Sequence, residues 1–289
     1  MKFLVKRFNK IFNKEKYFKM KFNEQEEKRQ SFFLNSFKEN INKMRYVLKE
    51  KKEINFLHSG QLGDIICSLP VIYSLSKKKC NLYLNIKNNN KFLNLQLYKK
   101  ILPLLKNQPY ITKVDTFKNQ IIDINLDLFR NFPFLWFSAN KIFLQLTGRH
   151  FDLSKRFIYS KKIDKFKKKI VIIRSLRRQN KLINYGFLEN YGDLIFLGLK
   201  DEFINLKKQL NTLNYYKCSN FLEMCSIINS SRLFIGNASF GYHLAEGLKV
   251  KRVLEKSSDG PDITPFGNTG YEFFFQEDFE KICKSLLKK

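Results

Sequence analysis

The sequence predicts an α/β protein of two Rossmann-like domains, with parallel sheets facing each other across a cleft, preceded by an N-terminal helical extension. Three observations predict this fold. From Glu53 onward, short β-like runs alternate with helical ones, which is the pattern of parallel βαβ units. A basic stretch, 161–169, interrupts the alternation, which begins again at Ile170. A strand that runs through a glycine-containing turn into a helix occurs once in each half, at 54–66 and 233–248.

The composition is that of a globular chain. Its 289 residues, 44% of them hydrophobic, are enough to fill two modest domain cores. The formal net charge is +28, but 43 of the 54 basic residues are lysines, and Asn, Ile and Phe are also abundant, as AT-rich coding sequence produces. The charge is therefore weak evidence about partners, although it favours polyanionic ligands. Because the sequence contains no recognised nucleic-acid-binding motif, nucleic acid ranks below the other partners.

The cysteine pattern predicts a cytoplasmic protein. Five cysteines are scattered along the chain, without a C-x-x-C pair or zinc-ligand spacing, which is typical of reduced thiols. We expect no metal site. The N-terminus mixes basic and apolar residues and nowhere do 18 apolar residues run together, so we expect neither a signal peptide nor a membrane span.

Residues 1–52 form a basic block without Gly or Pro, in which apolar residues recur with nearly helical spacing. We expect two amphipathic helices here. Their apolar positions are Phe8, Ile11, Phe12, Phe18, Phe22, Phe33, Phe37, Ile41, Met44, Val47 and Leu48. Two interpretations stay open: a peripheral anchor on the anionic inner membrane face, and helices that pack on the following domain or stay partly ordered.

Two domains and a final helix follow this extension. Residues 53–160 are predicted to form the first Rossmann-like domain, with strands 54–58, 82–86, 113–117 and 121–126 and helices 65–76, 92–105 and 135–146. Residues 170–275 are predicted to form the second, with strands 170–174, 194–197, 215–217, 233–235 and 252–254 and helices 202–210, 221–228 and 241–248. A C-terminal helix occupies 276–289. A ligand cleft is expected at the carboxyl ends of the strands.

The first strand–helix turn holds the candidate catalytic residues. Gly60 and Gly63 allow a tight turn and close backbone approach, and together with Gln61 they form the predicted acceptor loop. Asp64 stands where the helix begins, so it is either a helix cap or a general base that takes a proton from an acceptor hydroxyl. His58 ends the strand and is a second candidate base, with a buried structural histidine as the alternative.

The second turn predicts a phosphate-binding helix N-terminus. The spacing from Gly236 to Gly241 is that of a P-loop, but Tyr242 and His243 replace the Lys and Ser or Thr of that motif. A Walker A nucleotide triphosphatase is therefore excluded.

A diphosphate remains the best ligand for this turn. Backbone N–H groups, the Ser239 hydroxyl and His243 could hold it, with Asn237 and Gly241 in the same turn. Glu246 shares a helix face with His243 and could accept ribose hydroxyls, or it could be an exposed helix residue.

A basic loop follows the strand that opens the second half. Arg174 ends this strand directly and, with Ser175, is expected to face the cleft and stabilise phosphate charge. Arg177, Arg178 and Lys181 could equally be a solvated loop in a chain rich in cations.

Taken together, these residues resemble family 9 glycosyltransferases, the ADP-heptose:lipopolysaccharide heptosyltransferases of GT-B fold. The likeness covers about 53–270. The matching segments are Gly60-Gln61-Leu62-Gly63-Asp64 with Leu69-Pro70, Leu194-Ile195-Phe196-Leu197-Gly198 with Asp201-Glu202, and Gly236-Asn237-Ala238-Ser239-Phe240-Gly241-Tyr242-His243-Leu244-Ala245-Glu246-Gly247-Leu248.

The resemblance implies an enzyme that transfers a sugar from a nucleotide diphosphate donor to a glycan or lipid-linked acceptor, with inversion and without metal, as in lipopolysaccharide biosynthesis. Asp64 would match the catalytic base, and Ser239, Gly241 and His243 would line the donor diphosphate. No cofactor is implied beyond the nucleotide-sugar co-substrate. The sequence contains no D-x-D pair, in agreement with metal-independent transfer.

Two positions depart from the family pattern. Ala238 stands where the family has Asp, and Phe240 stands where it has Gly. These departures keep two alternatives open: a non-catalytic protein that binds a sugar nucleotide or glycan, and a sugar-nucleotide epimerase, which also uses two facing nucleotide domains.

Overall fold

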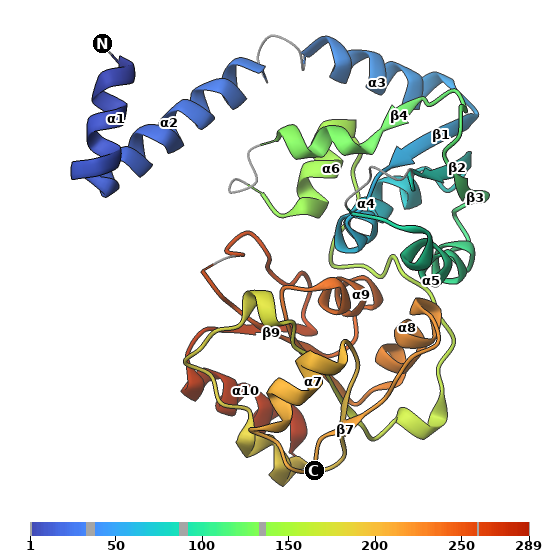
Figure 1. Cartoon of the computed structure of the whole chain (residues 1–289). Helices are drawn as coiled ribbons and strands as arrows, with labels where there is room; N and C mark the ends of the chain where they lie inside the picture. The colour runs from blue at the N-terminus through green and yellow to red at the C-terminus, as the bar shows by residue number, and fades with distance from the viewer. Residues whose placement is uncertain (1, 33–37, 87–91, 133–136, 259, 289) are drawn as a thin grey trace.

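Two α/β units, each built around a parallel sheet, make up the body of the molecule, and a helical arm extends from one of them (Figure 1). This computed structural model describes residues 2–32, 38–86, 92–132, 137–258 and 260–288. The predicted α/β architecture with two parallel sheets and an N-terminal helical extension is confirmed.

The first sheet has four parallel strands in the order β3-β2-β1-β4. Its strands are β1 (Glu53–His58), β2 (Lys79–Leu84), β3 (Lys113–Thr116) and β4 (Ile124–Asn125). Its helices are α4 (Leu62–Tyr73), α5 (Leu95–Lys106) and α6 (Ala139–Thr147), with the 3-10 helix η2 (Leu126–Asn131) after β4.

Most elements of this half match their predictions within three residues, and two strands differ in ways that the structure explains. The predicted strand 121–126 pairs only over two residues, because the Asn125 side chain accepts the N–H of Asp127 and starts η2. The second strand begins before the predicted 82–86, in register with the full length of β1. The beginning of the predicted helix 135–146 lies outside the described residues.

The second sheet has six parallel strands in the order β10-β9-β8-β5-β6-β7. Its strands are β5 (Ile170–Ile173), β6 (Leu194–Phe196), β7 (Asn214–Tyr215), β8 (Leu233–Asn237), β9 (Arg252–Glu255) and β10 (Gly270–Phe273). Its helices are α7 (Lys200–Lys207), α8 (Phe221–Ser230), α9 (Phe240–Leu248) and α10 (Gln276–Leu287). The strand β10 was not predicted; it is an edge strand in which only Phe273 is buried.

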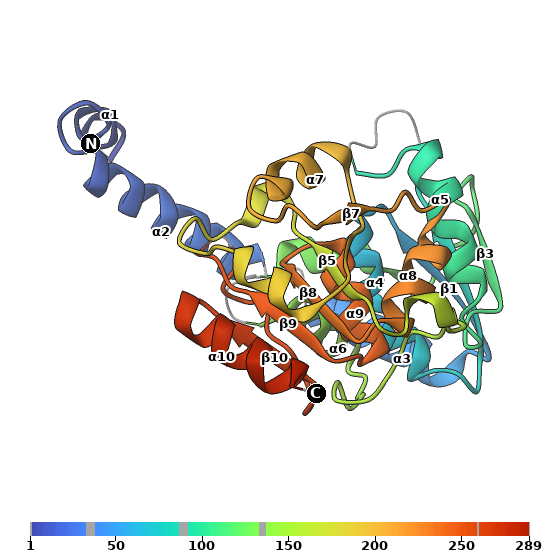
Figure 2. The same cartoon turned by 90° about the horizontal axis from the view of Figure 1, so that it is seen from below.

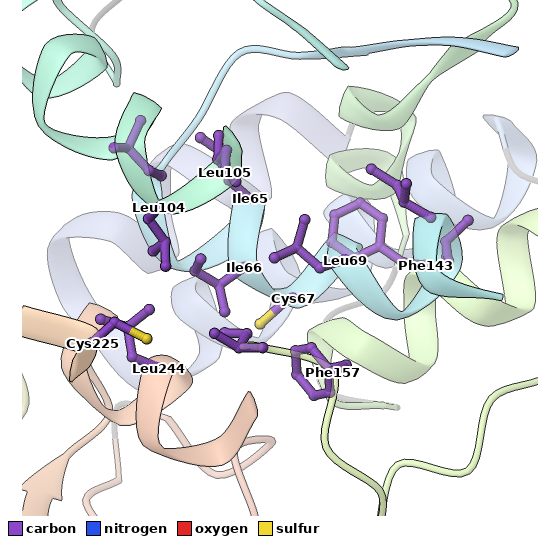
Figure 3. Packing of buried hydrophobic residues seen from close by; sticks show 14 of the residues in the cluster. Ile65, Ile66, Cys67, Leu69, Leu104, Leu105, Phe143, Phe157, Cys225 and Leu244 are labelled. Atoms are coloured by element: carbon purple, nitrogen blue, oxygen red, sulfur yellow. The ribbon is translucent and has the colours of Figure 1, made fainter. Parts of the chain in front are cut away.

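Helix α4 joins the two domains through an apolar interface. Its residues are buried from Ile65 to Ile72. Figure 3 shows its side chains between Leu104 of α5 on one side and Cys225 of α8 and Leu244 of α9 on the other. One continuous hydrophobic cluster therefore spans both domains and holds the two strand–helix turns next to each other.

A second hydrophobic cluster covers the opposite face of the second sheet. The C-terminal helix α10 lies beside β10 there (Figure 2). The Phe279 ring stacks on Phe273 at 4.0 Å between centroids. The basic stretch 161–169 between the two predicted domains is anchored, since Phe166 is buried and the Ile163 N–H donates to Ser230 Oγ at 2.6 Å.

Three helices precede the first strand, where the sequence predicted two: α1 (Lys2–Phe12), α2 (Lys14–Phe32) and α3 (Lys38–Glu50). Helix α3 packs on the first domain through Met44 and Leu48, as one of the two interpretations expected. Helices α1 and α2 instead project away from both domains (Figures 1 and 2). Phe33 and Phe37 lie outside the described residues.

Candidate active site

A cavity of about 320 Å³ lies between the two domains, lined by the N-termini of α4 and α9. It is found at the carboxyl ends of β1, β5 and β8, the edge at which parallel α/β sheets bind ligands. The first domain lines it with Gln61, Leu62, Gly63, Asp64, Phe92, Leu97 and Ala139. The second domain lines it with Arg177, Arg178, Ala238, Ser239, Phe240, His243, Asp262 and Ile263.

Asp64 both caps a helix and lines this cavity. Its Oδ2 atom accepts the backbone N–H of Gln61 at 3.3 Å, which satisfies an N-terminal group of α4. The same oxygen accepts a hydrogen bond from Arg130 Nη2 at 3.0 Å. The side chain keeps 23% of its surface exposed. The two interpretations of Asp64 are therefore compatible, because the cap orients the carboxylate at the cavity wall.

Arg130 is a site residue that the sequence reasoning missed. It comes from η2, donates also to the Gly60 carbonyl oxygen, and places its guanidinium 4.6 Å from the centre of the Phe92 ring. No sequence signal distinguishes it, since it is one of many cations in this chain and lies 66 positions from Asp64.

The two glycines of the acceptor loop are needed for different structural reasons. Gly60 has a φ of 89°, a left-handed conformation that favours glycine. A Cβ atom on Gly63 would lie 2.9 Å from Cδ2 of His243, so this glycine permits the close approach of α9 rather than that of a ligand. Gln61, the N-cap of α4, lines the cavity.

His58 is a structural histidine and does not line the cavity. It is fully buried, accepts the Gly60 N–H at Nδ1 over 3.0 Å, and lies 3.5 Å from Asp127. The rings of Phe129 and Phe143 pack against it, and burial lowers its pKa. Of the two alternatives for His58, a second base or a buried structural histidine, the structure supports the structural histidine.

The N-terminus of α9 presents polar groups to the cavity. Ser239 is its N-cap, and within the described residues its buried hydroxyl has no hydrogen-bond partner. His243, one turn later, lies with Nδ1 3.3 Å from Cys67 Sγ of α4. Burial lowers the pKa of His243 to about 4, against the opposing effect of the Asp64 charge, so its imidazole is neutral at pH 7.

Asn237 positions the basic loop instead of facing a ligand. Its Oδ1 accepts the Ser175 N–H at 2.9 Å, and its Nδ2 donates to the carbonyl oxygens of Ser175 and Arg178 at 2.8 and 2.9 Å. Asn237 is fully buried and neither it nor Ser175 lines the cavity. The amide therefore ties the end of β8 to the loop after β5.

Arg174 is turned into the core, contrary to the expectation for it. Its guanidinium forms a paired contact with Glu255, at 2.7 and 2.9 Å, and lies over the Tyr185 ring. The cationic lining comes instead from Arg177 and Arg178, which the sequence could equally have placed in a solvated loop. The reason is geometric, because the inward-facing end of β5 is buried and only the following turn reaches the cavity.

Glu246 and Gly241 also have internal roles. Glu246 is buried and forms ion pairs with Lys249 and with Arg252, whose Nε lies 2.6 Å from Oε2. It is therefore neither the ribose-binding residue nor the exposed helix residue that the sequence suggested. A Cβ atom on Gly241 would lie 2.4 Å from Ile173 Cδ1, so this glycine serves helix–strand packing.

The two positions that depart from the family pattern both line the cavity. Phe240 is the first residue of α9, with ordinary helical backbone, and its ring packs on Phe221 at 4.6 Å. Ala238 is buried and contributes no polar atom from its side chain. Asp262, from the loop after β9, brings a carboxyl group to the same cavity, and burial raises its pKa.

Within the described residues, no group of three or more His, Cys, Asp or Glu side chains is arranged to hold a metal ion. Across 2–32, 38–86, 92–132, 137–258 and 260–288, no helix has the length and apolarity needed to cross a bilayer.

Comparison with solved structures identifies this architecture. A family 9 glycosyl transferase from Veillonella parvula is similar to the chain with a TM-score of 0.57 and 14% identity, over 82% of this chain and 89% of the other. The fold is GT-B. The ADP-heptose lipopolysaccharide heptosyltransferase II of E. coli also has a TM-score of 0.57, with 9% identity, over 81% of this chain and 98% of its own.

At the level of sequence, no protein-family profile and no curated protein matches this GT-B chain. The predicted GT-B fold with its two facing domains is thus supported by structure, and the cavity described above occupies the interdomain cleft of that fold.

Proposed function

We propose that this protein is a glycosyltransferase that moves a sugar from a nucleotide diphosphate donor to a glycan or lipid-linked acceptor. One observation carries the proposal. The interdomain cavity has an oriented carboxylate, Asp64, on the wall of the first domain, and two arginines and a helix N-terminus on the wall of the second. The GT-B fold shared with two solved glycosyltransferases supports this assignment.

The acceptor would be activated by Asp64. Its Oδ2 atom holds the Gln61 and Arg130 hydrogen bonds, which leaves Oδ1 to take the proton of an acceptor hydroxyl. The hydroxyl oxygen then forms a bond to the anomeric carbon, while the bond from that carbon to the diphosphate oxygen breaks. A single displacement of this kind inverts the anomeric configuration.

The leaving nucleotide diphosphate would be held on the opposite wall. It departs with the bonding electron pair, so negative charge develops next to Arg177, Arg178 and the N-terminus of α9. The Ser239 hydroxyl is a further donor at this wall. Because these cationic groups can neutralise the diphosphate, we propose transfer without a metal ion.

A heptose donor on ADP is the first candidate, because a solved structure with the same fold is an ADP-heptose heptosyltransferase that acts on lipopolysaccharide. We propose that the acceptor belongs to a lipopolysaccharide-like surface glycan and that transfer takes place in the cytoplasm. The cytoplasmic assignment is supported by five free cysteines, of which Cys67, Cys80, Cys225 and Cys283 are buried thiols.

The decisive experiment separates the two roles of Asp64. Asp64→Asn keeps a side-chain oxygen for the cap but removes the base, so we expect the transfer rate to fall about 10²–10⁴-fold with little change in the melting temperature. Glu223→Gln is the matched control. Glu223 caps α8 at the equivalent third position, through the Ser219 N–H at 2.7 Å, and is remote from the cavity lining.

Transfer is measured with ADP-, GDP- and UDP-sugars and a glycan acceptor, and binding of each donor by thermal shift. Wild-type transfer that Asp64→Asn leaves intact would refute the base assignment. Thermal stabilisation by a sugar nucleotide without any turnover would support the non-catalytic binding protein instead, which the missing carboxylate at Ala238 makes the second candidate. Conversion of the donor sugar in the absence of acceptor would indicate an epimerase.

A further inference from the structure

Helix α1 exposes an apolar face. Its residues Val5, Phe8, Ile11 and Phe12 are 42, 61, 69 and 71% exposed, respectively. With about 100° of rotation per residue, these positions share one arc of roughly 120° around the helix axis. The rings of Phe8 and Phe12 lie 4.8 Å apart, so they form one continuous surface. Isolated exposed apolar residues are common, but a contiguous face of this kind is typical of an interaction site.

This face is not the side on which α1 packs against α2. The packed side carries Asn9, which is 5% exposed and places Nδ2 2.9 Å from the Val5 carbonyl oxygen and 3.5 Å from Met20 Sδ. An ion pair between Lys6 and Glu24 adds a second link between the helices. These contacts hold α1 in a hairpin with its apolar face outward.

The hairpin places α1 far from the body of the protein. Helix α2 extends from the first domain as an arm, and α1 lies at its distant end in both views (Figures 1 and 2). Figures 1 and 2 both show α1 apart from the two sheet domains, in the part of the chain that the structure describes.

The charge of α1 indicates what its apolar face meets. The helix contains Lys2, Lys6, Arg7 and Lys10 and no acidic residue. Both Arg7 and Lys10 are exposed; Arg7 borders the apolar arc, and Lys10 lies farther around the helix, on the side opposite the arc. Basic residues beside an aromatic and aliphatic face are the pattern of a helix that lies in the interface of an anionic membrane.

We propose that α1 binds the surface of an anionic lipid bilayer, with Phe8, Ile11 and Phe12 among the acyl chains, Arg7 at the lipid phosphates, and Lys10 on the outer side of the helix, where its charge adds to the attraction. A second copy of the chain is a weaker occupant, because an 11-residue helix offers much less area than the roughly 800 Å² per partner of a stable protein interface. The inference does not rest on the proposed function, since a chain without transferase activity would still bind vesicles.

The test uses the full chain and sedimentation with two kinds of vesicle. We expect binding to vesicles that contain phosphatidylglycerol and at least about tenfold weaker binding to pure phosphatidylcholine. The double variant Phe8→Ser with Phe12→Ser should lose at least about tenfold in affinity for the anionic vesicles. Arg7→Gln with Lys10→Gln should lose about tenfold as well.

The matched control is Ile121→Ser with Leu182→Ser. These two side chains are 81 and 70% exposed on the sheet domains. Their replacement removes a similar apolar area from a surface outside α1 and should leave vesicle binding unchanged. The proposal would be overturned if wild-type protein did not bind anionic vesicles, or if the Phe8 and Phe12 variant bound them with wild-type affinity. A dimer in light scattering that this variant converts to monomer would assign the face to self-association instead.

Discussion

Arg130 and Asp64 form an ion pair, with Nη2 3.0 Å from Oδ2, at the point where η2 meets the N-terminus of α4. The two residues come from segments 66 positions apart, yet both act on the same turn, because Arg130 also binds the Gly60 carbonyl oxygen. The proposed base is therefore oriented from two directions, by the backbone of its own helix and by the cation of a neighbouring element.

Removal of this cation should slow transfer without unfolding the protein. We expect Arg130→Met to reduce kcat about 10–100-fold, because the carboxylate loses one of the two contacts that orient it. Arg130→Lys should recover part of the rate, since an ammonium restores the charge but not the planar geometry. Arg149→Met is the control, because Arg149 bonds to Ser74 away from the cavity. Equal kcat in wild type and Arg130→Met would exclude the positioning role.

The two arginines of the cavity should determine donor affinity. We expect Arg177→Gln with Arg178→Gln to raise the donor KM about 10–100-fold, because charge-assisted bonds to the diphosphate are lost. The effect should shrink at high salt, where the wild type also binds weakly. Lys181→Gln, from the same loop but outside the cavity lining, should change KM little. A donor KM that depends equally on all three residues would point to general electrostatic attraction.

Asn237 should affect the donor site without touching the donor. Its amide holds the loop of Ser175 and Arg178 with three backbone contacts. We expect Asn237→Ala to lower the free energy of unfolding by about 1–3 kcal/mol and to raise the donor KM, since the loop loses its anchor. Urea unfolding and donor titration measure the two effects. A lower free energy of unfolding with an unchanged donor KM would show that the loop keeps its position without Asn237.

Glu255 and Arg174 should matter for stability and not for binding. Both side chains are almost fully buried, so Glu255→Gln leaves an uncompensated cation in the core. We expect a loss of about 3–5 kcal/mol in the free energy of unfolding. The fraction that stays folded should bind donor with wild-type affinity. A raised donor KM for folded Arg174→Met protein would indicate that Arg174 takes part in donor binding.

Stability should fall in mild acid because of His243. The folded protein holds its pKa at about 4, whereas the ordinary value is 6.5, so the unfolded chain binds the proton first as pH falls. The contribution of neutral His243 to the free energy of unfolding is therefore fully present above pH 6.5. It decreases toward pH 4 by up to about 1.4 kcal/mol per pH unit. Buried His58 adds a decrease of the same sign. We expect His243→Asn to flatten this decrease in urea titrations, and an unchanged decrease would contradict the assignment to His243.

Local patterns were sufficient for the fold and for part of both walls of the site. Apolar runs, glycine turns and helix periods are properties of neighbouring residues, and from them the parallel sheets, the cavity position and Asp64, Ser239 and His243 as lining residues could be predicted. The edge strand β10 was missed because pairing with β9 defines it, and among its own residues only Phe273 packs in the core.

The sequence by itself determined the alternation of strands and helices, and with it the two turns that meet at the cavity. Only the tertiary structure decided which polar side chains face that cavity. Arg174 and Arg178 are chemically alike and four positions apart, but one is paired with Glu255 in the core and the other lines the cavity. The physical reason is that burial and pairing depend on partners far away in the chain, as with Arg130 and Asp64, whereas periodicity depends only on near neighbours.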